Sequence, residues 1–388
     1  MIRRTTLLLL AIAFLASCKQ RQPEAPQPSS AAEQAGAEKA AEKQAAAAEE
    51  AEKDASVASV SGKSDPACIG PIGPGETGTV TIRDRKFVRN GHELRIEGSA
   101  PEGAEVRIGV LANLNVANGE NLFNLRRYLA EFEKAGVELI LVAGDSGDEL
   151  AAIEGNLRAV AEAGVPVLAI AGNRERTRDF VAAVENVRKE KPNLLNGHQI
   201  RQLGLHGLDI VTLPGYHDPR YIHQEAGEGC QYFVEDVKAV QELAAQAKNP
   251  VLLLAHGQPK GVTRDALDVI APDGEHIGDS NLNEAIRAAN IRFGIFANVK
   301  EAGGKALADL EGNRVVPEGE WSEALYLNPG AADSLEWTMN DGTPAHGMAA
   351  ILHFKDGKAS YRVYRAPKLT EAEREEAAKL APAKVAAD

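Results

Sequence analysis

The sequence predicts an α/β fold in which helices cover a layered sheet core. From Glu105 onward, short apolar runs alternate with segments of helical periodicity. The runs VRIGVLA, VELILVA and VPVLAIA are followed by helical patterns over 121–135, 149–163 and 176–189, and the runs VLLLA and IRFGIFA come later. Such alternation indicates a layered α/β core whose functional site gathers where the strands end.

Length, composition and charge narrow the classes of function. The chain has 388 residues, of which 44% are hydrophobic, so it can bury the core of one or two domains. Its formal net charge is −13 and it has no basic cluster, which argues against binding to a nucleic-acid backbone. No Gly-rich phosphate loop follows a strand and no Gly-x-Ser-x-Gly elbow occurs, so P-loop and α/β-hydrolase interpretations lack their residues.

Residues 1–18 have the features of a bacterial lipoprotein signal peptide. The charged start MIRR precedes an apolar run that is too short to span a bilayer. The end of the segment, LASC, resembles a lipobox, in which Cys18 becomes the lipidated first residue of the mature protein. We therefore expect an extracytoplasmic protein held at a membrane by an N-terminal lipid. Lys19 favours, by analogy with Gram-negative sorting, the outer membrane, on its periplasmic or surface face. An ordinary signal peptide with an incidental cysteine is the alternative.

The remaining sequence divides into four parts. Residues 19–66 are rich in Ala, Glu, Gln, Lys and Pro, so we expect a disordered tether. Residues 67–104 contain the β-prone pieces TVTIRD, RKFVR and HELRIEG, which predict a small antiparallel β unit that forms an accessory sheet. The main domain spans 105–366. Residues 367–388 predict a polar C-terminal helix and tail that form a solvated flank.

Cys68 and Cys230 are the two cysteines that remain once Cys18 is lipidated. An even pair of cysteines in an oxidising compartment predicts a disulfide. This bond would link the β unit covalently to the main domain.

Polar clusters follow five of the apolar runs. They read LANLN, GD, GNRE, HG and ANVK and begin at residues 111, 144, 172, 256 and 297. Their order resembles the calcineurin-like metallophosphoesterase family, whose blocks run Asp-x-His, Gly-Asp, Gly-Asn-His-Asp/Glu, a lone His and Gly-His-x-His. The resemblance covers about Glu105 to Val363 and includes LNPG at 327–330, which looks like the family's late turn. It implies that family's four-layer α/β/β/α sandwich for the main domain.

The resemblance also assigns the site residues. The family holds two metal ions that share a bridging Asp, and Asp145 takes that position. Asn173 and His256 are retained ligands of the second ion, with Asn298 as an available fourth ligand. The other ligand positions hold groups that bind divalent ions weakly or not at all, namely Asn113, Asn115, Asn298 and Lys300.

These substitutions predict a degenerate site. A dinuclear centre needs anionic oxygens and neutral imidazoles to hold its ions and to lower the pKa of a bound water. We therefore expect the first metal to be lost and at most one weakly bound divalent ion (Mn, Zn or Fe) to lie at Asp145, Asn173 and His256. Arg174 stands at the position of the family's catalytic His, so no catalytic residue is assigned.

Arg174 and Lys300 offer another arrangement of charge. In it, these fixed cations replace the lost metal charge and pair with Asp145. Because buried positive charge without partners is costly, an anion would then lie beside them.

Other polar residues near these clusters have simpler interpretations. We expect Asp148 to be the N-cap of the helix over 149–163, and Glu175 to hydrogen-bond its own turn. The loop PGYHDPRYIHQ carries His217 and His223. We interpret it as a surface loop, because no acidic or Cys partner sits at a recognised metal-ligand spacing.

The expectations favour binding over catalysis. The leading hypothesis is an envelope lipoprotein whose metallophosphoesterase-like domain is a pseudoenzyme and binds or scaffolds an anionic or phosphate-bearing ligand. Two alternatives stay open: an active phosphoesterase with a single metal or an altered site, and a purely structural envelope lipoprotein. The sequence names no ligand and no protein partner.

Overall fold

A computed structural model of the chain describes residues 62–99, 103–270 and 273–380. These residues belong to one compact unit, Ala58–Asp388. The signal peptide with Cys18, nearly all of the tether, and residues 381–388 lie outside the described residues, so the expectations for them stay predictions. No helix in the described ranges is long and apolar enough to cross a bilayer.

Two large sheets form the centre of the unit. The first has six strands in the order β20 (Lys358–Arg365), β19 (Met348–Lys355), β4 (Glu105–Leu111), β5 (Leu139–Ala143), β6 (Val167–Ile170) and β7 (Leu194–Asn196). The second has ten, in the order β1 (Thr77–Ile82), β2 (Arg85–Asn90), β3 (Glu93–Ile96), β8 (Gln202–Gly204), β9 (Asp209–Leu213), β10 (Val251–Ala255), β13 (Phe293–Ile295), β16 (Leu325–Asn328), β14 (Lys305–Leu307) and β15 (Val315–Val316). Strands β4 to β7 are parallel, as are β9, β10, β13 and β16.

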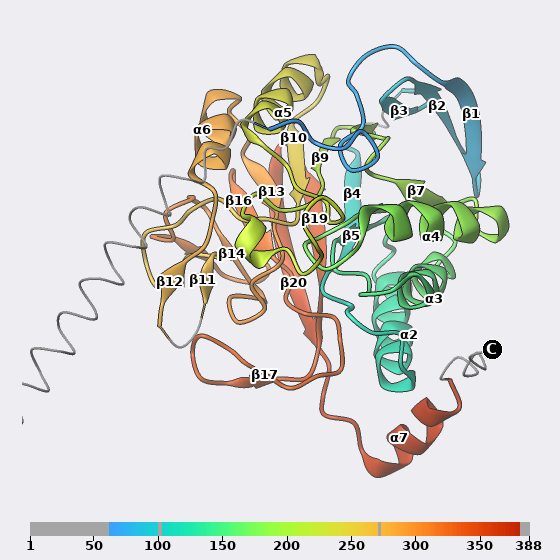
Figure 1. Cartoon of the computed structure of the whole chain (residues 1–388), viewed down its shortest axis with the longest axis vertical. Coiled ribbons are helices and arrows are strands. Elements are labelled where there is room, and N and C mark those ends of the chain that lie inside the picture. The colour runs from blue at the N-terminus through green and yellow to red at the C-terminus, as the bar shows by residue number, and fades with distance from the viewer. Residues whose placement is uncertain (1–61, 100–102, 271–272, 381–388) are drawn as a thin grey trace, which may run out of the picture. The chain divides into compact units, whose positions relative to one another are not determined.

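Helices form the outer layers of this arrangement. Figure 1 shows one group of three helices together on one side of the sheets and a pair on the other. The group is α2 (Gly119–Lys134), α3 (Leu150–Ala161) and α4 (Thr177–Glu190), and the pair is α5 (Val234–Gln246) and α6 (Ser280–Ala288). Helix α4 contacts β7 of the six-stranded sheet and α5 contacts β9 of the ten-stranded sheet. The predicted four-layer α/β/β/α sandwich is therefore present.

The two faces of β5 explain why its sequence reads as one apolar run. All five of its residues are buried. Leu139 and Leu141 belong to the core between the sheets, whereas Ile140 and Val142 belong to the core beneath the helices. Each such side chain contributes about 1.5–3 kcal/mol when it is fully buried. A strand buried on both faces has no polar position to alternate with, as in parallel sheets covered by helices.

The predicted N-terminal β unit is correct in its pairing but not in its independence. Strands β1, β2 and β3 pair antiparallel in sequence order. Strand β3 also pairs with β8, with Glu93 opposite Gln202 and Leu94 opposite Leu203. The three strands are thus the edge of the ten-stranded sheet and do not form an accessory sheet. The pairing of β3 with β8 could not be predicted from the sequence, because β8 lies about a hundred residues further along the chain.

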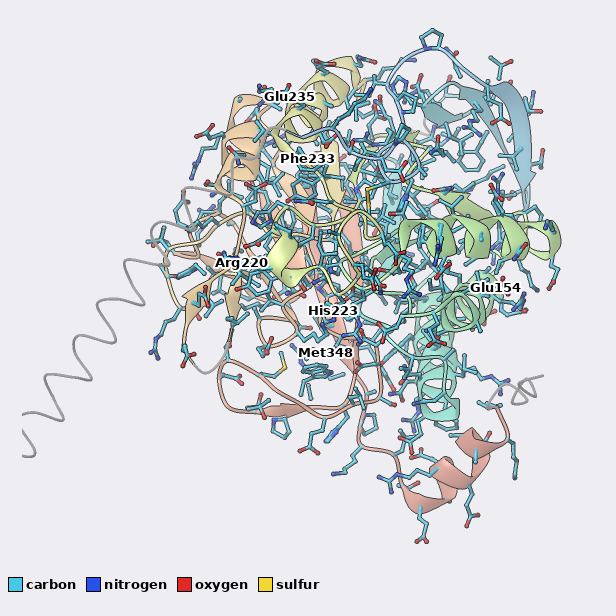
Figure 2. The ribbon with its side chains drawn as sticks, viewed as in Figure 1. Glu154, Arg220, His223, Phe233, Glu235 and Met348 are labelled. Atoms are coloured by element: carbon cyan, nitrogen blue, oxygen red, sulfur yellow. A yellow bond between two sulfur atoms is a disulfide. The ribbon has the colours of Figure 1, made fainter. Side chains whose placement is uncertain are left out.

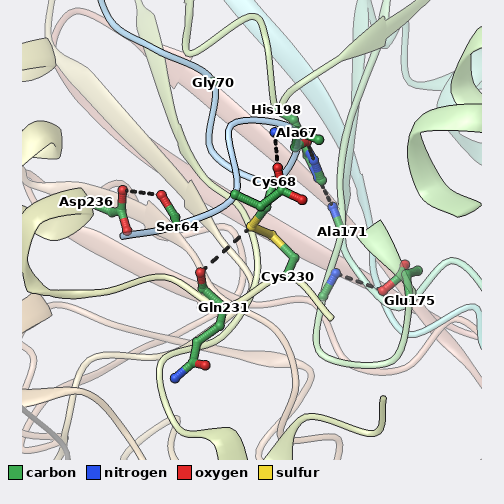
Figure 3. Close-up of a disulfide and its surroundings, with 12 residues drawn as sticks. Ser64, Ala67, Cys68, Gly70, Ala171, Glu175, His198, Cys230, Gln231 and Asp236 are labelled. Atoms are coloured by element: carbon green, nitrogen blue, oxygen red, sulfur yellow. Dashed lines mark hydrogen bonds between the residues drawn. A yellow bond between two sulfur atoms is a disulfide. The ribbon is translucent and has the colours of Figure 1, made fainter. Parts of the chain in front are cut away.

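A short segment before β1, residues 64–70, is fixed to the body and is called the strap below. Figure 3 shows the disulfide between Cys68 and Cys230. Their Cα atoms are 5.2 Å apart. His198 Nδ1 lies 2.9 Å from Ala67 O, and Arg201 Nη1 donates to Gly70 O at 3.0 Å. The expected tether boundary at residue 66 is therefore slightly late, since residues 64–66 already belong to the body.

Smaller elements complete the unit. The hairpins are β11 (Val269–Ile270) with β12 (Glu275–His276) and β17 (Trp337–Thr338) with β18 (Pro344–Ala345), and a 3₁₀ turn spans Pro219–Tyr221. The predicted C-terminal helix is α7 (Glu371–Ala378), capped by Thr370. It packs on α2, where Arg127 pairs with Glu373, so it is more than a solvated flank.

Candidate functional site

The polar strand ends lie together at one edge of the sheets, as the sequence predicted. Asn113 N donates to Gly144 O at 3.0 Å, which joins the ends of β4 and β5. Asn173 N, beyond β6, donates to Asp145 Oδ1 at 3.2 Å. His256 Nε2, beyond β10, lies 3.4 Å from the same oxygen. The residues at these strand ends form a strand-end cluster: Asn113, Asn115, Asp145, Asn173, His256, Asn298 and Lys300.

The strand-end cluster is buried. The exposed fraction of its asparagine, aspartate and histidine residues runs from 0% to 9%. The Lys300 side chain is 12% exposed, and that of neighbouring Arg174 is 24% exposed. A ligand that approaches from solvent therefore meets Arg174 and Lys300 before it meets Asp145.

The backbone of the cluster is held in an uncommon conformation. Asn113, Asn115, Asp145 and Asn298 have φ angles of 52°, 56°, 57° and 54°, in the left-handed region. Asparagine and aspartate tolerate this region better than other residues with a Cβ, because their short polar side chains bond locally. The ends of β4, β5 and β13 therefore turn sharply in a conformation that these residue types tolerate.

Gly172 explains the closeness of the strand ends. A Cβ atom added there would lie 2.3 Å from Asp145 Oδ1 and 2.6 Å from the His256 ring. Only glycine leaves room for that carboxylate and that imidazole to meet, which gives the Gly-Asn block its physical meaning.

On one side of Asp145, three hydrogen-bond acceptor atoms lie close together with no donor hydrogen between them: Asp145 Oδ1, Asn173 Oδ1 and His256 Nε2. His256 Nδ1 lies 2.7 Å from Ala143 O, a pure acceptor, so this nitrogen carries the proton. The Asn173 amide is oriented by its Nδ2, which donates to Tyr221 O at 2.6 Å, so Oδ1 faces His256 Nε2 at 3.1 Å. Burial lowers the pKa of His256, against the charge of Asp145, which favours the neutral ring. Its Nε2 lone pair therefore faces two oxygens, a set suited to one divalent cation.

The other side of Asp145 differs in chemistry. Asn113 is fully buried, and neither polar atom of its amide has a hydrogen-bond partner within the described protein. Asn115 Nδ2 donates to Asp333 Oδ2 at 2.5 Å, which leaves its Oδ1 unpartnered. Burial raises the pKa of Asp333, against hydrogen bonds from Trp337 and Asn115. At the positions where the resemblance implies charged and imidazole ligands, this side presents neutral amides, which bind divalent ions more weakly.

Lys300 supplies a positive charge on that same side. Its Nζ lies 3.8 Å from Asp145 Oδ2 and donates to Asn298 O at 3.2 Å. It also lies 5.3 Å from the centre of the Trp337 ring, within the range of a cation–π contact. The expected pairing of Lys300 with Asp145 is therefore present.

Arg174 does not make the expected side-chain pair with Asp145. Its Nε and Nη2 both donate to Asp148, each at 2.7 Å, and this bidentate bond raises the pKa of Arg174. Only the Arg174 backbone N–H reaches Asp145, at 3.2 Å. The expectation that Asp148 caps the next helix is wrong, because Glu149 is the N-cap of α3 and makes no side-chain cap bond.

Glu175 holds two of the strand-end turns together. Its carboxylate accepts the backbone N–H groups of Ser146 and Gly172, the second at 2.9 Å, so it bonds more than its own turn. The residue is fully buried. Burial, together with the charge of Asp145, raises the pKa of Glu175 to about 8.

The loop with the two histidines covers the cluster. His223 N donates to Asn173 O at 2.9 Å, and the His223 side chain is exposed; Figure 2 labels it on this loop. His217, which was expected on the surface, is half-buried, and its ring centre lies 4.7 Å from that of Tyr216. Burial lowers the pKa of His217. In the described part of the chain, no three His, Cys, Asp or Glu side chains form a group suited to a metal ion.

The sequence pattern did not predict three residues that lie at the site. Asp333 and Trp337 reach the cluster from the segment after the late turn, where Trp337 Nε1 donates to Asp333 Oδ1 at 2.9 Å. Tyr216 packs against His256, with ring centres 6.4 Å apart. None of the three follows an apolar run directly at a strand end, so no local pattern distinguished them from ordinary core residues.

Comparisons with known proteins find similarity in structure but not in sequence. No protein-family model and no curated protein matches this chain. A crystal structure without a stated protein name aligns with 68% of this chain and 99% of its own, at 13% identity and a TM-score of 0.50. A dimetal phosphatase from Danio rerio aligns with 68% of this chain and 99% of its own, at 11% identity and a TM-score of 0.43. The protein TT1561 of Thermus thermophilus aligns with 60% of this chain and 93% of its own, at 16% identity and a TM-score of 0.43.

The chain has the calcineurin-like phosphoesterase fold. Within it, the two sides of Asp145 differ in their fitness for a metal ion. His256 Nε2, Asn173 Oδ1 and Asp145 Oδ1 fit one divalent ion, which would act as a Lewis acid when bound. The side with Asn113, Asn115 and Lys300 does not fit one while the Lys300 ammonium lies beside Asp145 Oδ2. One side of Asp145 in this fold therefore presents residues that fit a metal ion, and the other side presents amides and the Lys300 ammonium.

Proposed function

We propose that this protein is a lipid-anchored envelope protein whose calcineurin-like domain binds an anionic or phosphate-bearing ligand without hydrolysing it. One observation carries the proposal. The residue at the position of the family's catalytic His is Arg174, and its guanidinium is bound to Asp148. An always-charged guanidinium cannot act as a general acid for a leaving group near neutral pH.

The exposure of the Arg174 and Asp148 pair supports ligand binding there. The two side chains are 24% and 41% exposed. An ion pair of this exposure contributes at most about 1 kcal/mol, so a phosphate group can replace Asp148 at little cost. A guanidinium binds phosphate with two parallel hydrogen bonds, and Lys300 adds a second cation nearby.

The test combines turnover with binding. Purified protein is assayed for phosphomonoester and phosphodiester hydrolysis with Mn²⁺ or Zn²⁺, and calorimetry measures the binding of inorganic phosphate. We expect no turnover above that of Asp145→Ala, and binding that Arg174→Ala weakens about 10- to 100-fold. Arg178→Ala is the matched control, because Arg178 lies four residues further along the chain, in the first turn of α4, and is exposed. Metal-dependent turnover that Asp145→Ala abolishes would overturn the proposal. Phosphate binding that neither Arg174→Ala nor Arg178→Ala changes would show that the ligand does not bind at Arg174.

A single-metal phosphoesterase is the second candidate. The neutral His256 ring, with its lone pair facing Asn173 Oδ1 and Asp145 Oδ1, favours it. On this hypothesis one equivalent of Mn²⁺ or Zn²⁺ binds, and His256→Ala removes both the metal and the hydrolysis. A purely structural lipoprotein would show neither metal binding nor phosphate binding.

The proposed location rests on Cys18 and has its own test. In its host, a Cys18→Ser variant is expected to leave the membrane fraction or to accumulate with its signal peptide attached. Normal processing and unchanged membrane partition of this variant would exclude the lipid anchor.

A further inference from the structure

The side of Asp145 that faces Asn113 and Asn115 is rich in unsatisfied oxygen atoms. Asp145 Oδ2, Asn113 Oδ1 and Asn115 Oδ1 have no hydrogen-bond partner within the described protein, and all three residues are at most 4% exposed. Backbone bonds hold them on adjacent strand ends, since Asn115 N donates to Asp145 O at 2.9 Å. Buried oxygens of this kind require a cation or a hydrogen donor.

The same region holds two buried carboxylates. Asp145 and Asp333 are both fully buried. Asp333 is satisfied by Trp337, Leu335 and Asn115, whereas Asp145 Oδ2 has no such donor. Two negative charges in a protein interior need a positive charge close to them.

Lys300 is placed to provide that charge. Its ammonium lies 3.8 Å from Asp145 Oδ2, and its charge also lowers the pKa of Asp333 against the effect of burial. Among the described residues, no arginine and no other lysine forms an ion pair with Asp145. The ammonium is fixed by the Asn298 carbonyl and by the face of Trp337.

We infer that the Lys300 ammonium is the resident cation of this oxygen-lined side, a tethered substitute for the metal ion that does not fit there. The proposed ligand would also meet Lys300, but the inference rests only on the contacts of Lys300 with Asp145, Asn298 and Trp337. It follows that the fold depends on Lys300 for charge balance at Asp145, and that removal of the ammonium converts the side into a site for a free hard cation. The oxygen atoms of Asp145, Asn113 and Asn115 are ligands of the type that such cations take.

Lys300→Met tests this inference, because methionine keeps most of the side-chain volume and removes the charge. Thermal unfolding is followed in EDTA and in about 1 mM Mn²⁺, a concentration chosen to load a weak oxygen site. We expect Lys300→Met to lower Tm by about 5–10 °C in EDTA and Mn²⁺ to restore at least half of the loss. Lys300→Arg, which keeps a cation, is expected to retain most of the wild-type Tm and to gain no such response. Lys305→Met is the matched control, since Lys305 is a half-buried lysine outside the cluster, and is expected to show no response to Mn²⁺.

A second substitution separates this site from a metal on the His256 side. In the Lys300→Met background, His256→Ala is expected to leave the Mn²⁺ response in place, whereas Asp145→Asn is expected to abolish it. A response that disappears with His256→Ala would assign the ion to the other side and overturn the inference. Lys300→Met with an unchanged Tm would also overturn it. Lys300→Met that is unfolded in EDTA and is recovered in soluble form only with Mn²⁺ supports the inference. If Lys300→Met stays unfolded with and without Mn²⁺ while Lys300→Arg folds, the result counts against the new cation site.

Discussion

Removal of the Cys68–Cys230 disulfide is expected to destabilise the fold mainly through the unfolded chain. The double variant Cys68→Ala/Cys230→Ala is the perturbation, because a single replacement would leave a free thiol. In the folded state both residues are fully buried. The strap around Cys68 keeps its other bonds, including Gln199 Nε2 to Pro66 O at 3.1 Å, so the folded state should change little.

The sequence separation of the two cysteines gives the magnitude. The bond closes a loop with a separation of 162 residues. Chain entropy for a loop of this length gives about 5 kcal/mol of stabilisation at 25 °C, an upper value because native strain offsets part of it. With an unfolding entropy of roughly 2.1 cal/mol/K per ordered residue, this free energy corresponds to a fall in Tm of about 8 °C.

Urea denaturation followed by tryptophan fluorescence is a suitable assay, since Trp321 and Trp337 both lie in the described fold. The variant should unfold at lower urea with a larger m-value, because its unfolded chain is less compact. Wild-type protein unfolded in dithiothreitol should match it. Gln199→Ala is the matched control, because it removes one strap hydrogen bond and keeps the disulfide. A midpoint and m-value equal to those of oxidised wild-type protein would refute the loop-entropy argument.

Three further outcomes follow from the site and its surroundings. The pKa of Glu175 is raised from 4.5 to about 8 in the folded state, so the free energy of unfolding should fall as pH rises between these values. Tm measured from pH 5 to 9 should show this fall. The Glu175→Gln variant should have a flatter dependence of Tm on pH. Burial lowers the pKa of His198 from 6.5 to about 4, so its contribution to stability is full above pH 6.5 and is lost as pH falls toward 4. The His198→Gln variant should lose less stability in acid than the wild-type protein. A variant with the same dependence of Tm on pH as the wild-type protein would contradict this prediction. Because the Arg174 and Asp148 pair is partly exposed, Asp148→Ala should lower the free energy of unfolding by less than about 1 kcal/mol in urea titrations, and a loss several times larger would show that the pair is structural.

The sequence was sufficient to predict where the strand-end residues meet. Parallel strands place their carboxyl ends at one edge, so Asp145, Asn173 and His256 come together once each is known to follow an apolar run. The relation of the N-terminal strands to the rest was not predictable in this way. The pairing of β3 with β8 depends on main-chain groups, which carry no signature in the side-chain pattern of β3.

The partners of charged side chains were the least predictable part. The local pattern allowed Asp148 to be a helix cap, and only the fold shows that Arg174, 26 residues away, binds it instead. The segment with Asp333 and Trp337 enters the site from beyond the last predicted block. An ion pair between exposed groups is weak and leaves no periodicity in the sequence, so such partners require coordinates.

The asparagines at the strand ends can be understood from the backbone. Asn113, Asn115 and Asn298 all occupy the left-handed region, with φ between 52° and 56°. A residue with a Cβ is strained there, and asparagine is among the least strained. Asparagine can therefore replace a charged or imidazole ligand at these positions and keep the sharp turn on which the packing of the strand ends depends. In the proposed pseudoenzyme such a position would lose its metal ligand and keep its turn, provided that the charge on Asp145 is balanced by another cation. Lys300 meets that condition, since its ammonium lies 3.8 Å from Asp145 Oδ2.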